Sequence, residues 1–486
     1  MLIFISKIEK CKQKKFPFQK FQKKKDFEYS SLIGPFHLKI ALFSLKMGSD
    51  DEDKVTLDTL PNEIFLYICT YLDSYFILNV LKKVCTRFDN ILSDDYVWRK
   101  KTSIDYPNTT ILFPETDSEP DNNSNKPWTA MVYEVETNRK FFQDAKATEN
   151  SETDAKKVME NSEMQTDDKK DPESNGMQKI VFKDLHISTI NALKLVCDNR
   201  LCISVSRDRS IGVWNVADSA TQAVRQVYPA HDGWVWCIDS CIGTDTFCTG
   251  AWDSTLKIWS LEDFTNISTY KYQGTVLSVS CTEFLVAAGL FNAKLIVQDT
   301  RVPHVDGFHG IPWYVVEHTF EKKGVIQGVT IDGQNVYVAS ANGIISCYDM
   351  RKKDVVNSTA PLCNKKDNIM SYSYRNGNIV MGDTGNTLTI LNRNLEVLAQ
   401  RTIEFENPLQ RKLSCIKQND YDIFVGSKGS LHSFIKSDPI TAVERLQSCN
   451  YEMTAIEYEF DQILLHSSNL DGEIVMLKRP QNTITV

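Results

Sequence analysis

The sequence of 486 residues lacks the features that mark membrane-spanning, zinc-binding or disulfide-bonded proteins. It contains no run of 18 apolar residues, the length that a helix needs to cross a bilayer. It has no Cys-x-x-Cys pair and its eight His are dispersed, so we expect no metal site. Its 13 Cys are scattered, and many lie in apolar runs, as Cys202 and Cys248 do. This pattern predicts reduced thiols and a cytoplasmic or nuclear location.

Motifs of the common hydrolases and nucleotide-binding enzymes are also missing. The sequence contains no Gly-x-Ser-x-Gly, no His-Glu-x-x-His and no phosphate-binding loop with Gly-Lys-Ser/Thr. Its many carboxylates form no recognisable pair. We therefore expect a protein that is not an enzyme and needs no cofactor.

The charge is unevenly distributed. The chain carries a formal net charge of −8, yet residues 1–46 contain eleven Lys against three acidic residues, so the remainder is close to −16. An acidic body argues against nucleic acid as the main partner. We expect residues 1–56, basic and then acidic, to be a disordered extension that can be removed up to Met47.

Two stretches of the sequence share one internal spacing. In each, a His stands 28 positions before a Trp and an Asp stands six before it: His186, Asp208 and Trp214 in the first, His231, Asp253 and Trp259 in the second. A buried His, a turn Asp, a strand hydroxyl such as that of Thr249 and an indole N–H can satisfy one another only when strands hold them at fixed offsets. This spacing is typical of a WD-repeat blade, and we expect these residues to be structural rather than catalytic.

The same strand end recurs five more times. The equivalent positions are 39 to 50 residues apart and fall at Trp214, Trp259, Gln298, Tyr348, Leu391, Phe434 and Leu477. Six positions before each lie residues that, apart from Lys428, tolerate a left-handed turn: Asp208, Asp253, Asn292, Asn342, Gly385 and Asp471. The pattern predicts an all-β seven-bladed propeller over residues 179–480, with 179–184 (KIVFKD) completing the last blade. A β-sandwich pair is the alternative.

The segment before the repeats is expected to be helical. Residues 57–100 place Ile64, Ile68 and Leu72 at intervals of four, and a second helix from Ser74 places Phe76, Val80, Leu81 and Val84 at helical spacing. Residues 101–178 are expected to be a linker with one helix over 127–142 and an acidic disordered stretch after it. The predicted fold class is thus a small all-α module followed by the propeller.

Residues 57–100 resemble an F-box. The resemblance rests on Leu60-Pro61, Glu63, Tyr71-Leu72, Val84-Cys85, Arg87-Phe88 and Trp98. With the repeats that follow, the chain resembles the F-box and WD-repeat proteins, and the segments HDGWVWCI and GAWDSTLKIW are most similar to the subgroup numbered 9 in that family. The resemblance implies a substrate receptor of an SCF-type ubiquitin ligase. It also implies three partners, namely a Skp-family adaptor, a cullin scaffold and an unidentified protein substrate.

Two surfaces are candidates for binding. Short helices with apolar residues on more than one face predict an adaptor surface made of Leu60, Pro61, Ile64, Ile68, Leu81 and Val84. A second surface is predicted from three residues that directly precede blade turns, Arg207, Trp252 and Phe291, and from Trp234 at the start of a strand. Trp252 or Phe291 could instead fill the central channel. A WD-repeat scaffold without a ligase role is the alternative function.

Overall fold

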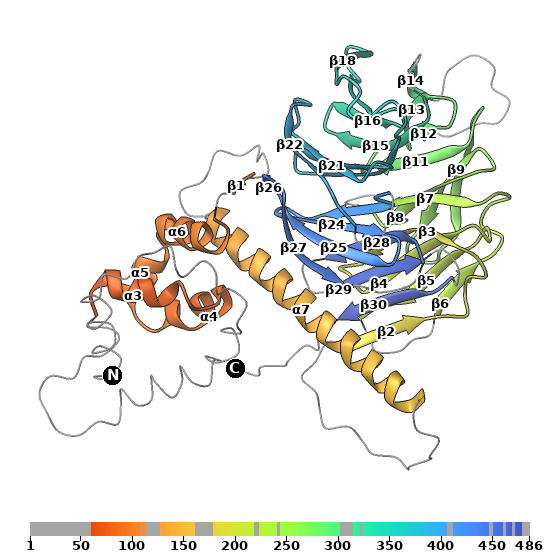
Figure 1. Ribbon diagram of the computed structural model, residues 1–486. Helices are drawn as coiled ribbons and strands as arrows, with labels where there is room; N and C mark the ends of the chain where they lie inside the picture. Colours follow the sequence, from red (N-terminus) through yellow and green to blue (C-terminus); the bar gives the residue numbers. More distant parts are fainter. Residues whose placement is uncertain are drawn as a thin grey trace, which may run out of the picture.

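The structure is a computed structural model in which a group of helices lies beside a β-propeller (Figure 1). Among the residues described, no helix is both long and apolar enough to cross a membrane. None of the ten cysteines within the described ranges forms a disulfide bond. The structure describes residues 60–107, 109–112, 127–160, 178–217, 223–240, 244–301, 314–320, 324–405, 412–446, 451–459, 463–468 and 472–478. Residues 1–56 therefore lie outside it, and the expectation for them stays a prediction.

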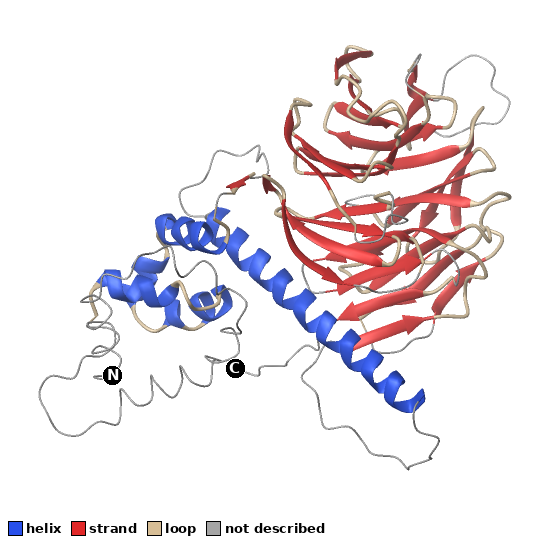
Figure 2. Cartoon of the chain, viewed as in Figure 1, coloured by secondary structure: helices blue, strands red, loops and turns tan. Residues whose placement is uncertain are grey.

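Seven four-stranded antiparallel sheets form the propeller, as predicted (Figure 2). Neighbouring sheets contact one another mainly through their first strands, which places these strands innermost. The first four blades are β3 (Ile190–Val196), β4 (Leu201–Ser206), β5 (Ile211–Asn215) and β6 (Ala223–Val227); β7 (Val235–Ser240), β8 (Thr246–Ala251), β9 (Thr255–Ser260) and β10 (Asn266–Lys271); β11 (Val276–Cys281), β12 (Leu285–Leu290), β13 (Lys294–Asp299) and β14 (Tyr314–Thr319); and β15 (Ile326–Asp332), β16 (Asn335–Ser340), β17 (Ile344–Asp349) and β18 (Asp354–Ser358).

The last three blades follow the same plan, with two departures. Blade six inserts the short β26 before its outer strand, and blade seven takes one strand from the start of the propeller. Their strands are β19 (Ile369–Arg375), β20 (Asn378–Asp383), β21 (Thr387–Leu391) and β22 (Val397–Thr402); β23 (Cys415–Gln418), β24 (Asp422–Ser427), β25 (Ser430–Ile435), β26 (Ser437–Asp438) and β27 (Thr441–Leu446); and β28 (Met453–Glu459), β29 (Ile463–Ser468), β30 (Ile474–Lys478) and β2 (Gln178–Phe182).

The borrowed strand closes the ring, as the sequence predicted. β2 pairs with β30 in antiparallel register, from Gln178 opposite Lys478 to Phe182 opposite Ile474. Phe182 is buried and packs edge to face on Trp214 of blade one, with ring centroids 5.5 Å apart. The closing strand thus bonds to the last blade and packs on the first.

Between the second and third strands of every blade one described residue has a left-handed conformation, one position later than expected. The positive φ angles lie at Arg209, Ser254, Ala293, Gly343, Asn386, Gly429 and Gly472. In blades one and two the preceding Asp adopts no positive φ, because its carboxylate caps the turn from the side chain. Asp471, expected at this place in blade seven, lies outside the described residues.

A continuous chain of hydrogen bonds fills the interior of blade one. The indole Nε1 of Trp214 donates to Ser204 Oγ at 2.8 Å, and Ser204 Oγ lies 2.7 Å from His186 Nε2. His186 Nδ1 lies 3.0 Å from Asp208 Oδ2. Blade two repeats the chain with Trp259, Thr249, His231 and Asp253 at matching distances. Every polar group in the chain has a partner, which supports the structural role.

The predicted helical module is present in the described N-terminal residues. It contains α3 (Asn62–Cys69), α4 (Ser74–Asn79), a 3-10 turn η2 (Leu81–Lys83), α5 (Thr86–Leu92) and α6 (Asp95–Asp105). The second helix is shorter than the spacing suggested, because α4 ends at Asn79 and the chain turns inward at Leu81. Trp98 is fully buried, and its indole donates to Leu92 O at 2.8 Å.

One long helix, α7 (Pro127–Glu160), follows the module and runs along the propeller (Figure 1). We expected a helix over 127–142 with disorder after it, so the prediction for 143–160 was wrong. Phe142 stacks on Phe424 of blade six, with ring centroids 5.7 Å apart, and Phe141 packs on Tyr458 of blade seven. Past the predicted end, Ala145 is buried in the same cluster and Lys146 pairs with Glu444 of blade six, so the helix keeps its contact with the propeller.

The same helix completes the core of the helical module. Met131, Val132 and Val135 of α7 pack with Phe65 and other core residues of the module, and this cluster reaches Tyr421 and Ile435 of blade six. Buried Lys101 of α6 donates to Glu136 of α7 at 2.8 Å. A short β1 (Thr110–Ile111) also pairs with β26. The module and the propeller therefore share one continuous apolar core.

Polar groups on α7 also bond to blades six and seven. Asn138 donates to Asp422 and accepts from the hydroxyl of Tyr458. Burial raises the pKa of Asp422 to about 6, although hydrogen bonds from Asn138 and Asn419 oppose that rise. Burial likewise raises the pKa of Glu134 to about 8. These groups specify one position of the helix on the propeller, because each buried polar group needs a partner when water is excluded.

The blade-two hydrogen-bond chain predicts how stability changes with pH. Burial alone would raise the pKa of Asp253, but hydrogen bonds from His231 and Thr255 hold it well below its ordinary value of 3.8. The folded state then binds fewer protons, so this stabilisation is present above about pH 4 and is lost as the pH falls further. Asp253→Asn should lower the free energy of unfolding at pH 7 by about 1–3 kcal/mol. In the Asp253→Asn variant, the free energy of unfolding should also fall less steeply between about pH 5 and pH 3 than in the wild type. Denaturant titrations at several pH values measure both, with exposed Asp232→Asn as control; an unchanged pH dependence in Asp253→Asn would contradict this account.

The shared core predicts that the helical module depends on α7. Val135→Asp places an unpaired charge among apolar residues and should cost about 3–5 kcal/mol. Amide hydrogen exchange of residues 62–105 should then accelerate. Lys140→Asp, on the exposed face of the same helix, is the matched control and should leave exchange unchanged. Equal protection in both variants would show that the module folds without the helix.

Candidate functional site

The predicted adaptor surface is largely exposed on the helical module. Pro61, Ile64 and Val84 are exposed, and Leu60 and Ile68 are partly buried. Arg87 donates to Leu60 O and to Asn62 Oδ1, which ties the start of α3 to α5 just beyond Val84. These bonds bring the Leu60–Pro61 segment and Val84 onto neighbouring elements.

Leu81 does not belong to that surface. Its side chain is 4% exposed and packs in the module core with Phe65, Ile77 and Trp98. The helical spacing suggested an outward position, but the break after Asn79 changes the direction of the chain. The assignment of Leu81 as a contact residue was therefore wrong for this conformation.

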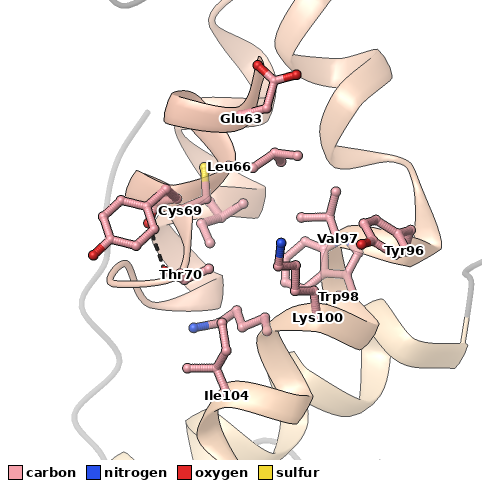
Figure 3. Close-up of a pocket in the computed structure, with 12 residues that line it drawn as sticks. Glu63, Leu66, Cys69, Thr70, Tyr96, Val97, Trp98, Lys100 and Ile104 are labelled. Carbon is pink, nitrogen blue, oxygen red and sulfur yellow. Dashed lines mark hydrogen bonds between the residues drawn. The ribbon is translucent and has the colours of Figure 1, made fainter. Parts of the chain in front are cut away.

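A hollow of about 310 Å³ lies between α3 and α6, and the sequence did not predict it (Figure 3). Tyr67 and Tyr96 at its rim are strongly exposed, as is Ile104. The remaining lining residues include Glu63, Leu66, Cys69, Thr70, Ile77, Val97, Trp98, Lys100 and Lys101. The signal was present in the spacing of Tyr96, Lys100 and Ile104 at intervals of four, which puts them on one face of α6.

The second predicted surface forms a continuous row of side chains across three blades. The Arg207 guanidinium carbon lies 5.5 Å from the ring centroids of both Trp234 and Trp236. Trp252 lies 5.4 Å from Trp234 and 5.8 Å from Trp236, and Phe291 lies 6.4 Å from Trp252. We call these five residues the aromatic shelf. Sequence reasoning missed Trp236, although its place two residues after Trp234 at a strand start was a usable signal.

The rings of the shelf are accessible to a partner. Trp234, Trp252 and Phe291 are 45%, 41% and 53% exposed, values that do not fit rings packed inside the channel. The structure therefore favours the surface position over the channel-filling alternative.

Backbone hydrogen bonds hold the shelf residues in place. The amide of each residue before the turn donates to the start of the first strand: Arg207 to Thr189 at 3.0 Å, Trp252 to Trp234 at 2.9 Å, and Phe291 to Thr275 at 2.9 Å. Gly233 allows the loop to approach closely, because a Cβ there would meet Asp253 N at 2.5 Å. The shelf is thus built on rigid elements, which reduces the entropy lost on binding.

The exposure of the shelf predicts a small effect on stability. Replacing Trp252 and Phe291 by Ala should lower the free energy of unfolding by less than about 2 kcal/mol, because about half of each ring is already exposed to solvent. Trp259→Ala, which removes a buried indole from the same blade, should cost about 3–5 kcal/mol. Chemical denaturation of the three proteins measures the difference. A loss as large in the shelf variant as in Trp259→Ala would mean that the shelf rings support the fold.

Comparison with known proteins identifies both parts of the chain. Residues 57–103 match the F-box-like family model, and residues 222–260 match the model of the WD domain, G-beta repeat. The solved structure of the RRP9 WD40 repeats superimposes with a TM-score of 0.53 at 11% identity, covering 62% of this chain and 99% of that one. At that identity the likeness shows the fold alone.

Two curated relatives carry both parts in their names. The bovine (Bos taurus) F-box/WD repeat-containing protein 9 is 24% identical over 257 residues, which cover 50% of this chain and 47% of the relative. The Caenorhabditis elegans F-box/WD repeat-containing protein mec-15 is 22% identical over 314 residues, which cover 61% of this chain and 65% of the relative. The chain thus spans about half the length of the bovine relative. Its F-box-like helices and seven-bladed WD-repeat propeller make it similar to the F-box/WD repeat-containing proteins.

Proposed function

We propose that this chain is the substrate receptor of an SCF-type ubiquitin ligase. In this proposal the F-box-like helices bind a Skp-family adaptor held by a cullin, and the propeller binds a protein substrate. The observation that carries the proposal is that an F-box-like segment and a WD-repeat propeller occur in one chain. Both modules typically bind proteins. The proposed site of action is the cytoplasm or the nucleus, in agreement with reduced thiols at the described cysteines.

The helical module offers the adaptor an apolar surface that its own core does not use. Exposed Ile64, Val80 and Val84 would lose contact with water on binding, which is the main source of affinity at such interfaces. The hollow between α3 and α6 adds a concave region beside this surface. A helical partner with projecting apolar side chains suits both.

In this proposal the chain contributes proximity rather than chemistry. Because α7 packs on both the module and the propeller, a substrate on the shelf is held at a fixed orientation relative to the adaptor. Restricting two reactants in this way lowers the entropic part of the barrier for ubiquitin transfer. No residue of this chain acts as a nucleophile or as a general base in such a role.

A WD-repeat scaffold without a ligase role is the competing function, and adaptor binding separates the two. Ile64→Asp with Val84→Asp should weaken adaptor binding by about 2–4 kcal/mol, a loss of at least about 30-fold. Co-purification of the Skp-family adaptor and the cullin measures the effect. Val397→Asp, an exposed change on β22 of the propeller, is the control and should retain both. If the double variant captures the adaptor at the wild-type level, this surface is not the adaptor site; if the wild type captures none, the scaffold function is favoured.

A further inference from the structure

The exposed apolar surface around the blade turns is concentrated on blades two and three. The corresponding turn residues of the next three blades are small or polar: Ala341, Thr384 and Ser427. The shelf therefore offers a ligand large apolar contacts at one end of a row and a single guanidinium at the other. A ligand that fits the shelf must therefore carry apolar groups at one end and a group that pairs with a guanidinium at the other.

Arg207 is the charged group of the shelf that remains open to a ligand. Its Nε donates to Asn191 Oδ1 at 3.1 Å, and its terminal nitrogens have no hydrogen-bond partner among the described residues. Two carboxylates next to the shelf, those of Asp208 and Asp253, do not compete for Arg207. Asp208 and Asp253 have side chains only 3% and 10% exposed and accept bonds within their own blades. A carboxylate can therefore approach Arg207 and form a charge-assisted pair.

A cationic ligand is disfavoured at the same place. The guanidinium of Arg207 already covers the faces of Trp234 and Trp236, which are the rings that would otherwise hold a methylated ammonium group. A second cation would meet like charge there. One arginine also pairs with one carboxylate, so a cluster of acidic groups is not required.

The spacing of the shelf fits an extended chain. Successive centroid separations along Trp234, Trp252 and Phe291 are 5.4 Å and 6.4 Å. Side chains on one side of an extended peptide recur every second residue, about 6.5–7 Å apart. Arg207 lies 5.5 Å from the Trp234 ring, so an acidic residue over Arg207 would place the side chains two and four positions away over Trp234 and Trp252.

We propose that the shelf binds an extended internal peptide segment in which one Asp or Glu is followed or preceded, at two-residue steps, by two large apolar side chains. The inference rests on the proposed function, because this segment would be the recognised part of the substrate. An internal segment fits better than a chain terminus, since terminal carboxylates are usually captured in backbone nests, whereas Arg207 presents a side chain on an open row.

Fluorescence anisotropy of a labelled peptide with the full chain tests this inference without an adaptor. The probe has the order Gly-Glu-Ser-Phe-Ser-Leu-Gly and is acetylated and amidated, so that its termini carry no charge. Glu→Gln in the probe, and Arg207→Gln in the protein, should each weaken binding at least about tenfold. Trp252→Ala should weaken it by a similar factor because an aromatic anchor is lost. The reversed sequence is tested in parallel, and binding of either direction supports the inference.

A matched pair elsewhere on the propeller provides the control. Arg301 lies over the exposed Phe284 at 4.4 Å, at turns on the opposite ends of the strands. Arg301→Gln with Phe284→Ala removes a second arginine–aromatic pair, in which the guanidinium already pairs with Asp299, and should leave the affinity unchanged. Three results would overturn the inference: no binding of either peptide, equal binding of the Gln probe, or preference for a trimethyllysine probe or for a free C-terminal carboxylate.

The experiment separates this inference from the proposed function. If the chain captures the adaptor but does not bind the peptide, the proposed receptor role still stands, and the acidic and apolar segment is rejected as its ligand. Peptide binding that depends on Arg207 and Trp252, with no adaptor capture, would retain the segment and reject the ligase role. Each arm therefore decides one of the two statements.

Discussion

The pairing of β2 with β30 is the interaction on which most of this structure depends. Without it, blade seven would leave an unpaired sheet edge, and the start of the propeller would not be bonded to the last blade by a strand ladder. Ring closure also fixes the angle between neighbouring blades. The aromatic shelf draws its residues from three of them, so its spacing is a consequence of closure rather than of any single turn.

The position of the buried polar chains explains why the shelf lies where it does. Asp208 and Asp253 accept bonds from His186 and His231, and they also accept from the backbone amides of Ile187 and Asp232. Each carboxylate thereby joins the turn after the second strand to the loop before the first. These are the loops that carry Arg207, Trp234 and Trp252. A rigid polar interior thus supports an exposed apolar surface.

Helix α7 has a comparable role between the two parts of the chain. Its apolar side chains fill the module core at one end and cover blades six and seven further along. Asn138 between these regions fixes the register, because a shift of one residue would bury its amide without partners. The F-box-like helices and the propeller are therefore best regarded as one cooperative unit. This property suits a receptor that must hold two partners at a set distance.

The amino-acid sequence by itself determined the blade period, the closing strand, the structural role of the two His–Asp–Trp chains and the identity of four shelf residues. All of these follow from local offsets that a strand or turn imposes on neighbouring residues. Tertiary structure decided the rest. Leu81 is buried because α4 ends at Asn79, and α7 keeps its contact with the propeller beyond residue 142 because Ala145 and Lys146 find partners about 300 residues away in the sequence. Trp236 joins the shelf, and the hollow forms between α3 and α6, because packing brings separate elements together. Local spacing marked Trp236 and one face of α6, but not the side chains that they meet.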